Sequence, residues 1–440
     1  MAMLRRLSAA AIAAAALLGV QAAPATAVGP AVVSRGVEIP DFYTPPAALP
    51  GADGALIRNE PLPLALSLPS IGGPLPGTAT RLMYKSTDST GQPVAVTGAY
   101  IEPAAPWLGG GPRPLVALAP GTMGQGDQCA ASMGLEHPIS LNGRTVSVGY
   151  EDLAIYRLLL RGTAVVVTDY IGLGATDRLH TYVNRVDEGH ALLDAARAAR
   201  SVPRASVTAA SRVGLFGYSQ GGGASAAAAE LRSSYAPDVN LVGTAAGAPP
   251  ADLREVVPGI DGSDITGVLG WSLNGFLQTD PSLRPLAESH LTEAGRAALE
   301  DLSTMCIGDA LFAYGGTESR AWTVDGASLS EVIASEPALK ATLDAQRIGD
   351  LKPSGPVRVS TGTADDVVPH GQARQLAVDW CGKGANVTYK PVLLPSGGEQ
   401  ALTNHFLPLL ADQGDAIGWL TDRLVGLPVV SNCWTMPVQP

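Results

Sequence analysis

The stretch "RVGLFGYSQGGGASAAAAELRSSY", residues 212–235, places one serine between glycines, after an apolar run and before a run of small residues. The apolar run predicts a buried strand, and the small residues predict a helix that packs closely on it. G-x-S-x-G between a strand and a helix is typical of a nucleophile elbow, a sharp turn that exposes the serine hydroxyl. In such a turn, a side chain at position 217 or 221 would collide with neighbouring segments of the backbone, which explains why both residues are glycine. We therefore predict that Ser219 is a nucleophile; an ordinary glycine-rich turn is the alternative.

Apolar strands alternate with helical patterns on both sides of this motif. Two alternating segments around a polar turn predict a hairpin over residues 80–103. Helical patterns cover residues 188–203 and 222–235. Further strands are predicted at residues 113–121, 162–170, 212–217, 240–250, 356–365 and 386–394. This alternation indicates an α/β fold with a mostly parallel central sheet that is covered by helices on both faces.

The alternation stops between about residue 251 and residue 345, where only helical patterns occur. We interpret residues 251–345 as a helical cap inserted between two parts of one core, residues 79–250 and 346–440. An all-α domain unrelated to the site is the alternative. Residues 28–78 are rich in proline and glycine, and they predict an irregular arm that wraps over the core.

The first residues have the pattern of a secretory signal peptide. A short basic start precedes the apolar run "LSAAAIAAAALLGV", and Ala25 and Ala27 form an A-x-A cleavage pattern. Residues 1–27 are therefore predicted to be removed near Ala27, which places the mature protein outside the cell. An uncleaved anchor is the alternative. No later segment holds 18 apolar residues without Gly, Pro or charge, so we predict a soluble mature protein without a membrane span.

Composition excludes several classes of protein. A net charge of −11 argues against a nucleic-acid partner, and an apolar content of 46% argues against disorder. The chain has four cysteines and none lies in a CxxC motif, so two disulfides are favoured over a metal site outside the cell. The cysteines are Cys129, Cys306, Cys381 and Cys433, which allow three pairings. The predicted chemistry needs no metal or organic cofactor.

A serine nucleophile needs a histidine as base, and in this fold class the chain order is serine, acid, histidine. This order argues against His137, His180 and His190 as the base, because they precede Ser219 in the chain. His290 lies in the predicted helical insert, where a surface histidine is the simpler interpretation. His405 is favoured because it follows the last predicted strand, in a loop before the final helix. His370 remains the alternative, although it lies very close to the candidate acids.

The acid is expected in "GTADDVVP", residues 362–369, directly after a predicted strand. Asp365 fits the spacing of the turn and is favoured as the residue that orients the histidine. Asp366 is the alternative. Asp169 also ends a predicted strand, but it precedes the serine and is interpreted as an aspartate that holds a turn.

The oxyanion of an acyl-transfer reaction needs backbone N–H donors. One donor is predicted to be the N–H of Gln220, the residue after the nucleophile. The other is expected from the loop "APGTMGQGDQC", residues 119–129, which follows an earlier strand. Thr122 and Met123 are the candidates.

These motifs together resemble the secretory lipase family, and the likeness runs over most of the mature chain. Its marks include "GTMGQGDQCAAS" from residue 121 and "GYSQGGGASAAAAEL" from residue 217. The resemblance implies an α/β-hydrolase core with a helical lid, and a Ser219–Asp365–His405 triad. It also implies the disulfides Cys129–Cys306 and Cys381–Cys433. The chain reads "APGT" where relatives commonly have "HGT", which puts the second oxyanion donor in doubt.

The motifs and the resemblance predict a secreted serine hydrolase that cleaves carboxylic esters of lipids through an acyl-enzyme. The segment "ITGVLGWSLNGFL", residues 265–277, is the candidate lining of an acyl tunnel, and plain helix packing is the alternative. The expected partner is an ester substrate, with transient contact at a lipid interface. A short-chain carboxylesterase and an extracellular acyltransferase are alternatives on the same triad. An inactive binding protein on a hydrolase scaffold is the alternative from another class.

Overall fold

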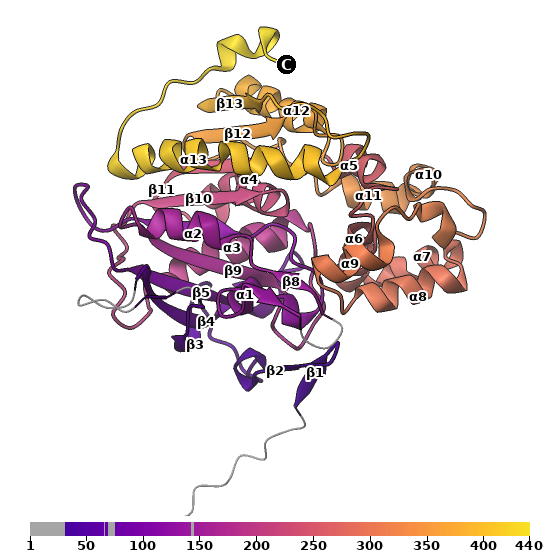
Figure 1. The fold of residues 1–440 in the computed structure, drawn as a ribbon, viewed down its shortest axis with the longest axis horizontal. Coiled ribbons are helices and arrows are strands. Elements are labelled where there is room, and N and C mark those ends of the chain that lie inside the picture. The colour runs from indigo at the N-terminus through magenta and orange to yellow at the C-terminus, as the bar shows by residue number, and fades with distance from the viewer. Residues whose placement is uncertain (1–30, 66, 69–74, 142–144) are drawn as a thin grey trace, which may run out of the picture. The chain divides into compact units, whose positions relative to one another are not determined.

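The computed structural model describes residues 31–65, 67–68, 75–141 and 145–440. The signal peptide predicted for residues 1–27 lies outside the described residues. The described chain is built around a nine-stranded sheet of order β13-β12-β11-β10-β6-β9-β5-β4-β3 (Figure 1). Its strands are β3 (Leu56–Leu62), β4 (Gly77–Thr87), β5 (Pro93–Pro103), β6 (Leu115–Ala119), β9 (Ala164–Ile171), β10 (Val213–Tyr218), β11 (Leu241–Gly247), β12 (Val357–Gly362) and β13 (Val387–Val392).

Neighbouring strands are parallel from β13 to β9, and the pairs from β9 through β5 and β4 to β3 are antiparallel. Every residue of β6, β9 and β10 is buried, which explains their continuous apolar sequences. The predicted α/β fold with a mostly parallel sheet is therefore confirmed.

Alternating residues of the strands face two helical layers. On β6, Val116 and Leu118 belong to the apolar cluster with α2 and α13, whereas Leu115 and Ala117 belong to the cluster with α3 and α4. The α12 helix packs beside α4 on the second face. The helices of the core are α1 (Ala131–Gly134), α2 (Asp152–Leu159), α3 (Arg185–Ala199), α4 (Gln220–Tyr235), α12 (His370–Gly382) and α13 (Leu402–Val425).

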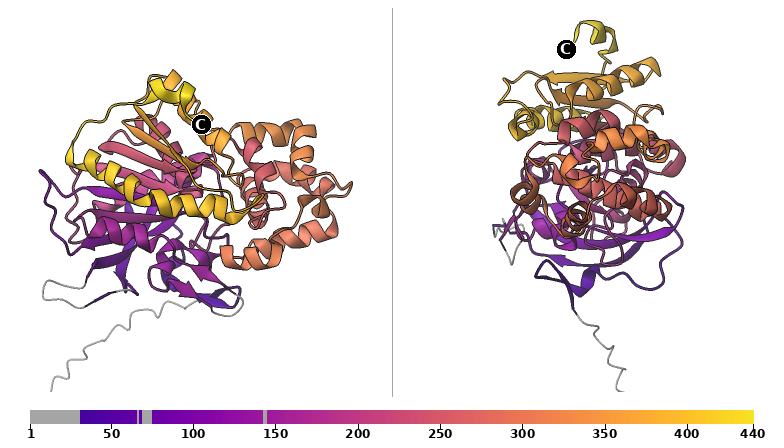
Figure 2. Two further views of the ribbon diagram at one scale, coloured as in Figure 1. Left: turned by 45° about the horizontal axis from the view of Figure 1, so that its top comes forward. Right: turned by 90° about the vertical axis from the view of Figure 1, so that its right-hand side faces the viewer.

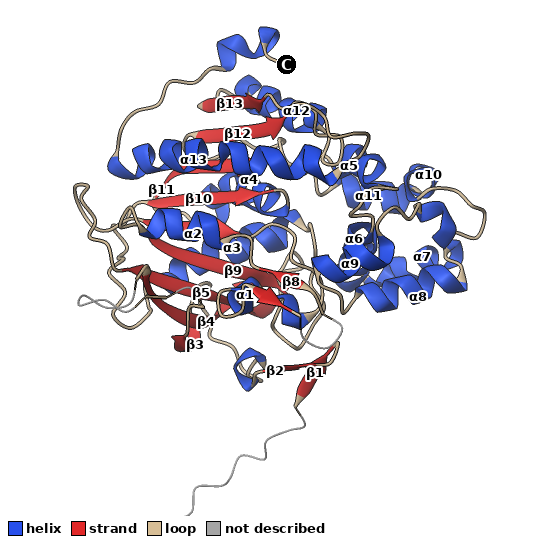
Figure 3. Cartoon of the chain, viewed as in Figure 1, coloured by secondary structure: helices blue, strands red, loops and turns tan. Residues whose placement is uncertain are grey.

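Between β11 and β12 the chain forms helices and loops, as Figure 3 shows. These helices surround an apolar cluster that includes Trp271, Phe276 and Leu302. In the right-hand view of Figure 2 they lie in front of one end of the sheet. The helices are α5 (Leu253–Ile260), α6 (Gly267–Thr279), α7 (Arg284–His290), α8 (Glu293–Leu302), α9 (Ile307–Tyr314), α10 (Leu329–Ser335) and α11 (Pro337–Asp344). We call this segment the cap.

The amino-terminal segment is more regular than the irregular arm predicted for residues 28–78. Two short strands, β1 (Val32–Ser34) and β2 (Val37–Ile39), form a hairpin. The β3 strand pairs antiparallel with β4 at the edge of the main sheet, and it contains Pro61. Proline lacks an N–H and fits a strand only where a neighbour is missing on one side, so an edge strand can carry the proline that argued against regular structure.

Another short hairpin, β7 (Ile139–Ser140) with β8 (Ser147–Val148), lies near the cap and contacts α9. At the other end of the chain, a disulfide joins Cys381 of α12 to Cys433, the first residue of a short 3-10 helix at Cys433–Val438. This disulfide attaches the carboxyl-terminal segment to the core.

Candidate active site

Ser219 stands at the turn between β10 and α4. Its backbone has φ 57° and ψ −124°, a region that L-residues rarely adopt. A Cβ on Gly217 would overlap the Gly221 carbonyl, and a Cβ on Gly221 would overlap the Ala119 carbonyl. The two glycines are therefore required by close approach of the backbone. Such local strain is maintained only where the surrounding fold holds it.

The structure brings Ser219, His405 and Asp365 into one chain of hydrogen bonds. Ser219 Oγ lies 2.8 Å from His405 Nε2, and His405 Nδ1 lies 2.7 Å from Asp365 Oδ2. Asp365 and His405 are both buried, with exposures of 3% and 5%. The second oxygen of Asp365 accepts a hydrogen bond from the Val368 N–H, which orients the carboxylate.

His405 lies on a helix, not on the loop that the sequence predicted. The α13 helix begins at Leu402, so His405 belongs to its first turns. Pro408 lies inside the helix, and a proline there removes a backbone hydrogen bond and normally marks a helix boundary. The Tyr218 hydroxyl donates to the His405 carbonyl at 2.8 Å, which ties this helix end to the elbow.

The alternative acid and base have other partners. Asp366 accepts hydrogen bonds from Asn404 Nδ2 and from the Gln400 N–H, both at 2.8 Å, and so holds the first turn of α13 and the residues just before it. His370 begins α12, and its Nε2 lies 3.2 Å from the Tyr389 hydroxyl. Burial lowers the pKa of His370. Neither residue contacts Ser219 among the hydrogen bonds of the described chain.

Asp169 is buried away from solvent and binds two hydroxyl side chains. It accepts hydrogen bonds from the Ser132 N–H, the Ser132 hydroxyl and the Thr97 hydroxyl. Burial raises its pKa. These contacts join β9 to α1 and β5, so Asp169 has a structural role, but none of them holds a turn as the sequence interpretation expected.

Gln220 is the first residue of α4, so its N–H has no acceptor within the helix. The N-terminus of a helix also carries a partial positive charge that favours an anion. Thr122 lines the cavity beside Ser219, whereas the Met123 side chain is buried in the core. Gln220 and Thr122 both line the cavity with Ser219, where the predicted oxyanion donors have to lie.

Side chains from two other segments, at residues 150–151 and at Tyr182, hold the loop that contains Thr122. Glu151 accepts from the Gly121 N–H at 2.7 Å, and the Tyr150 hydroxyl donates to the Thr122 carbonyl at 3.0 Å. The Thr122 and Tyr182 hydroxyls lie 2.7 Å apart. These residues were not predicted from the sequence, because a tyrosine or glutamate outside a motif gives no local signal of such a contact. Only the tertiary fold brings them to the loop.

The cap also holds this loop. The Gln125 N–H donates to the Met305 carbonyl at 2.9 Å, and the Ile307 N–H donates to the Met123 carbonyl at 2.8 Å. Between these contacts, the Cys129–Cys306 disulfide joins the loop to the start of α9. The loop is therefore positioned by the core on one side and by the cap on the other.

Replacing both Cys129 and Cys306 by serine is expected to lower the free energy of unfolding by about 5 kcal/mol. The disulfide closes a loop of 177 residues, and the entropy that it removes from the unfolded chain grows with the length of that loop. Urea unfolding measures the loss. The ester hydrolysis predicted from the sequence should also be slower in this variant at 25 °C, because the loop that contains Thr122 loses its covalent attachment to the cap.

Replacing both Cys381 and Cys433 is the matched control. This disulfide spans 52 residues, and its removal is expected to cost about 4 kcal/mol. It lies away from the oxyanion loop, so the rate at 25 °C should stay near that of the wild type. Equal losses of activity in the two variants would contradict the proposed coupling between the cap and the loop.

An apolar cavity opens at Ser219 and runs into the cap. Thr122, Tyr182, Ser219 and Gln220 form its polar end. The rest of the wall comes mainly from the cap and is mostly aliphatic or aromatic, with Ser272, His290, Thr323 and Thr342 as its polar side chains. Its apolar side chains include Leu253, Val256, Val257, Ile260, Leu277, Leu283, Val332, Ile333, Leu339 and Leu343. A fatty acyl chain fits such a wall chemically, because the wall offers it few polar groups.

Residues 265–277 combine the two roles that the sequence analysis left open. Val268, Leu273 and Phe276 of α6 line the cavity. Trp271 is wholly buried in the cap and donates from Nε1 to the Leu302 carbonyl at 2.8 Å. One face of α6 therefore forms the cavity wall, and another packs within the cap.

Comparison with known proteins finds a matching family model, related sequences and a similar solved structure, all named as lipases. The family model "Secretory lipase" matches residues 135–432. A probable inactive lipase of Mycobacterium tuberculosis is 30% identical over 394 residues, covering 89% of this chain and 83% of the relative. Lipase 10 of Candida albicans is 27% identical over 408 residues, covering 89% and 82%. The closed-state structure of Candida antarctica lipase A superposes with a TM-score of 0.75 at 20% identity, covering 91% and 89%.

Proposed function

We propose, since this chain belongs to the secretory lipase family, that it hydrolyses carboxylic esters of lipids through an acyl-enzyme on Ser219. One observation carries the proposal. The hydrogen-bonded chain from Asp365 through His405 to Ser219 ends at the mouth of an apolar cavity. A nucleophile, its base and the orienting acid are thus in contact at the place where an acyl chain can bind.

In the proposed mechanism, Ser219 Oγ attacks the ester carbonyl carbon while His405 Nε2 takes the hydroxyl proton. Asp365 holds the imidazole in the required tautomer and stabilises the imidazolium. The Gln220 and Thr122 N–H groups stabilise the oxyanion of the tetrahedral intermediate. His405 then gives its proton to the leaving alcohol, which leaves an acyl-enzyme. Water, activated by His405, cleaves the acyl-enzyme and restores Ser219.

The cavity supports a lipid ester over the short-chain esters of the alternative carboxylesterase. An acyl chain buried in an aliphatic cavity gains about 0.8 kcal/mol for each methylene removed from water. A long acyl chain therefore gains more from this wall than an acetyl group. The complete hydrogen-bonded triad argues against an inactive binding protein, although one relative carries the word "inactive" in its name.

Family membership and the two disulfides support a location outside the cell, where disulfides persist. In the part of the chain that the structure describes, none of the helices has the length and apolar character needed to cross a membrane.

A hydrolysis screen with p-nitrophenyl esters from acetate to palmitate tests the proposal. We expect wild-type turnover of long-chain esters, together with labelling by a fluorophosphonate probe that Ser219→Ala abolishes. Adding an acceptor alcohol to the assay detects the acyltransferase alternative. Absence of both turnover and labelling would refute the proposed function.

Filling the cavity should change the preference for chain length. Leu273→Trp adds bulk to the cavity wall on α6, and it is expected to lower kcat/KM for palmitate by about tenfold or more with little effect on acetate. Phe312→Trp is the matched control, because Phe312 is 84% exposed on the cap surface. If Leu273→Trp lowers kcat/KM equally for all chain lengths, the acyl chain does not occupy this cavity.

A further inference from the structure

The side chain of Gln220 is held at both of its amide hydrogens. Gln220 Nε2 donates to Glu188 Oε1 at 2.8 Å and lies 3.1 Å from His180 Nε2. The side chain is buried, with an exposure of 2%. Gln220 also carries the N–H proposed as an oxyanion donor, so its side-chain contacts bear directly on the position of that donor.

His180 is built to accept this hydrogen bond. Its Nδ1 lies 2.9 Å from the Ile171 carbonyl, which can only accept, so Nδ1 carries the hydrogen and Nε2 is the acceptor. The ring is stacked on Tyr170, with centroids 5.8 Å apart. Burial lowers the pKa of His180 to about 4, so the ring stays neutral at working pH.

Glu188 holds two backbone segments of the site at once. Besides Gln220 Nε2, Glu188 Oε1 accepts from the Val183 N–H at 3.0 Å. Val183 is a β-branched residue with φ 56°, a strained conformation that needs support from its surroundings. Glu188 on α3 thus contacts the first residue of α4 directly, and it also holds the end of the loop that carries His180 and Tyr182.

We propose that Glu188 and His180 are positioning residues which, by binding both amide hydrogens of Gln220, fix its backbone N–H toward the oxyanion. This inference rests on the proposed esterase function. Oxyanion donors stabilise the transition state only when they are fixed before the reaction, since reorganisation during the reaction costs free energy. His180 precedes the serine in the chain and so was not a candidate for the catalytic base, and Glu188 lies in no sequence motif.

The charge of Glu188 bears on the stability of the oxyanion, because only the Gln220 side chain separates Glu188 from the proposed oxyanion donor. Asp187 on α3, Tyr182 on the preceding loop and Tyr170 on β9 are the titratable groups that act on it, and neutral His180 reaches it through Gln220. Among the described residues, no ion pair joins Glu188 to a cation. Burial raises its pKa to about 8, so the acid is neutral at pH 7.

Two consequences follow from this raised pKa. Ionised Glu188 would oppose the negative charge of the oxyanion, so kcat should fall as pH rises above about 8. The stability that neutral Glu188 provides is complete below the usual pKa of 4.5 and is lost as pH rises through about 8.

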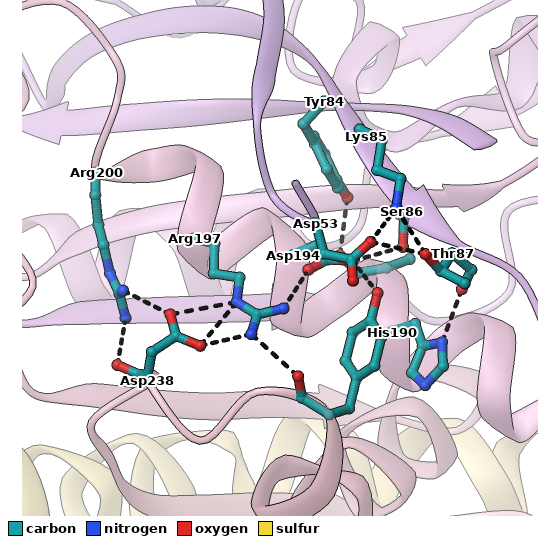
Figure 4. A network of polar contacts seen from close by, with 12 residues as sticks. Asp53, Tyr84, Lys85, Ser86, Thr87, His190, Asp194, Arg197, Arg200 and Asp238 are labelled. Atoms are coloured by element: carbon teal, nitrogen blue, oxygen red, sulfur yellow. Dashed lines mark hydrogen bonds and ion pairs between the residues drawn. The ribbon is translucent and has the colours of Figure 1, made fainter. Parts of the chain in front are cut away.

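Asp194 offers a matched control on the same helix. It accepts hydrogen bonds from the Ser86 and Tyr235 hydroxyls and from Arg197 Nη1, and Arg197 also pairs with Asp238 (Figure 4). This buried carboxylate is paired with a cation and has no contact with Gln220 in the described structure. Its removal tests the general effect of losing a buried carboxylate from α3.

The experiment measures kcat and KM for one long-chain ester from pH 6 to pH 9. We expect Glu188→Ala to lower kcat at pH 7 by about tenfold to hundredfold with little change in KM, because a lost oxyanion contact acts on the transition state. Glu188→Gln keeps the acceptor oxygen and should restore kcat at pH 7. The ratio of kcat in Glu188→Gln to that in wild type should then rise about tenfold from pH 7 to pH 9.

Asp194→Asn should lower stability but keep the wild-type pH profile, which separates positioning from folding. A flat ratio for Glu188→Gln, or an unchanged kcat in Glu188→Ala, overturns the inference while leaving the proposed function in place. If wild type neither hydrolyses esters nor reacts with a fluorophosphonate, the proposed function fails, and the inference fails with it.

Discussion

Ser219→Ala is expected to lower kcat for ester hydrolysis by about 10⁶-fold, which is the scale found when the nucleophile of a serine triad is removed. The variant cannot form the acyl-enzyme, and His405 has no hydroxyl to deprotonate. The cavity and the oxyanion donors remain, so binding of substrate should persist and KM should change little. Steady-state hydrolysis with purified protein, together with fluorophosphonate labelling, measures the loss.

Ser225→Ala is the matched control for this prediction. Ser225 lies on α4, the helix that follows the elbow, and its buried hydroxyl has no hydrogen-bond partner in the described structure. Its removal should leave kcat near the wild-type value. If Ser219→Ala retains more than about one hundredth of wild-type activity, Ser219 is not the nucleophile.

Asp365→Asn is expected to lower kcat by about 10⁴-fold, because an amide cannot hold His405 in the tautomer that leaves Nε2 free to accept a proton. The Asn side chain has the same shape, so folding should be nearly unchanged. The 2.7 Å contact between Asp365 Oδ2 and His405 Nδ1 is the geometric basis of this expectation. Single-turnover kinetics distinguishes a slow acylation step from slow release of product.

Asp366→Asn tests the other aspartate of the same turn. Asp366 holds Asn404 and Gln400, which precede His405, so its replacement should loosen α13 and lower kcat by about tenfold or less. A loss in Asp366→Asn that equals the loss in Asp365→Asn would contradict the assignment of Asp365 as the orienting acid.

The fold was predictable wherever the signal was local. Strands such as β9 and β10 are buried on both faces, so their apolar runs are visible without any knowledge of their neighbours. The β3 strand was missed because its proline is tolerated only at a sheet edge, and an edge is a property of the assembled sheet. The start of α13 was misplaced because packing keeps a helix intact across Pro408.

The residues of the candidate site also fall into those that could be predicted from a local signal and those that could not. The elbow could be predicted because Gly217, Ser219 and Gly221 belong to one turn. The close backbone contacts that require glycine at positions 217 and 221 arise at that turn, and the sequence motif spans only five residues. Tyr150, Glu151 and Glu188 were not visible, because each acts on a segment far from it in the chain. Nothing near these residues in the sequence records that contact.

A strand, a turn and a helix in direct succession suffice to expose the hydroxyl of Ser219, since backbone sterics operate over neighbouring residues. Which imidazole and which carboxylate meet that hydroxyl depends on the whole sheet, because Ser219 and His405 are 186 residues apart in the chain. The same holds for the environment of Glu188. Burial of a carboxyl group depends on side chains from several elements, and only their packing decides whether it carries a charge.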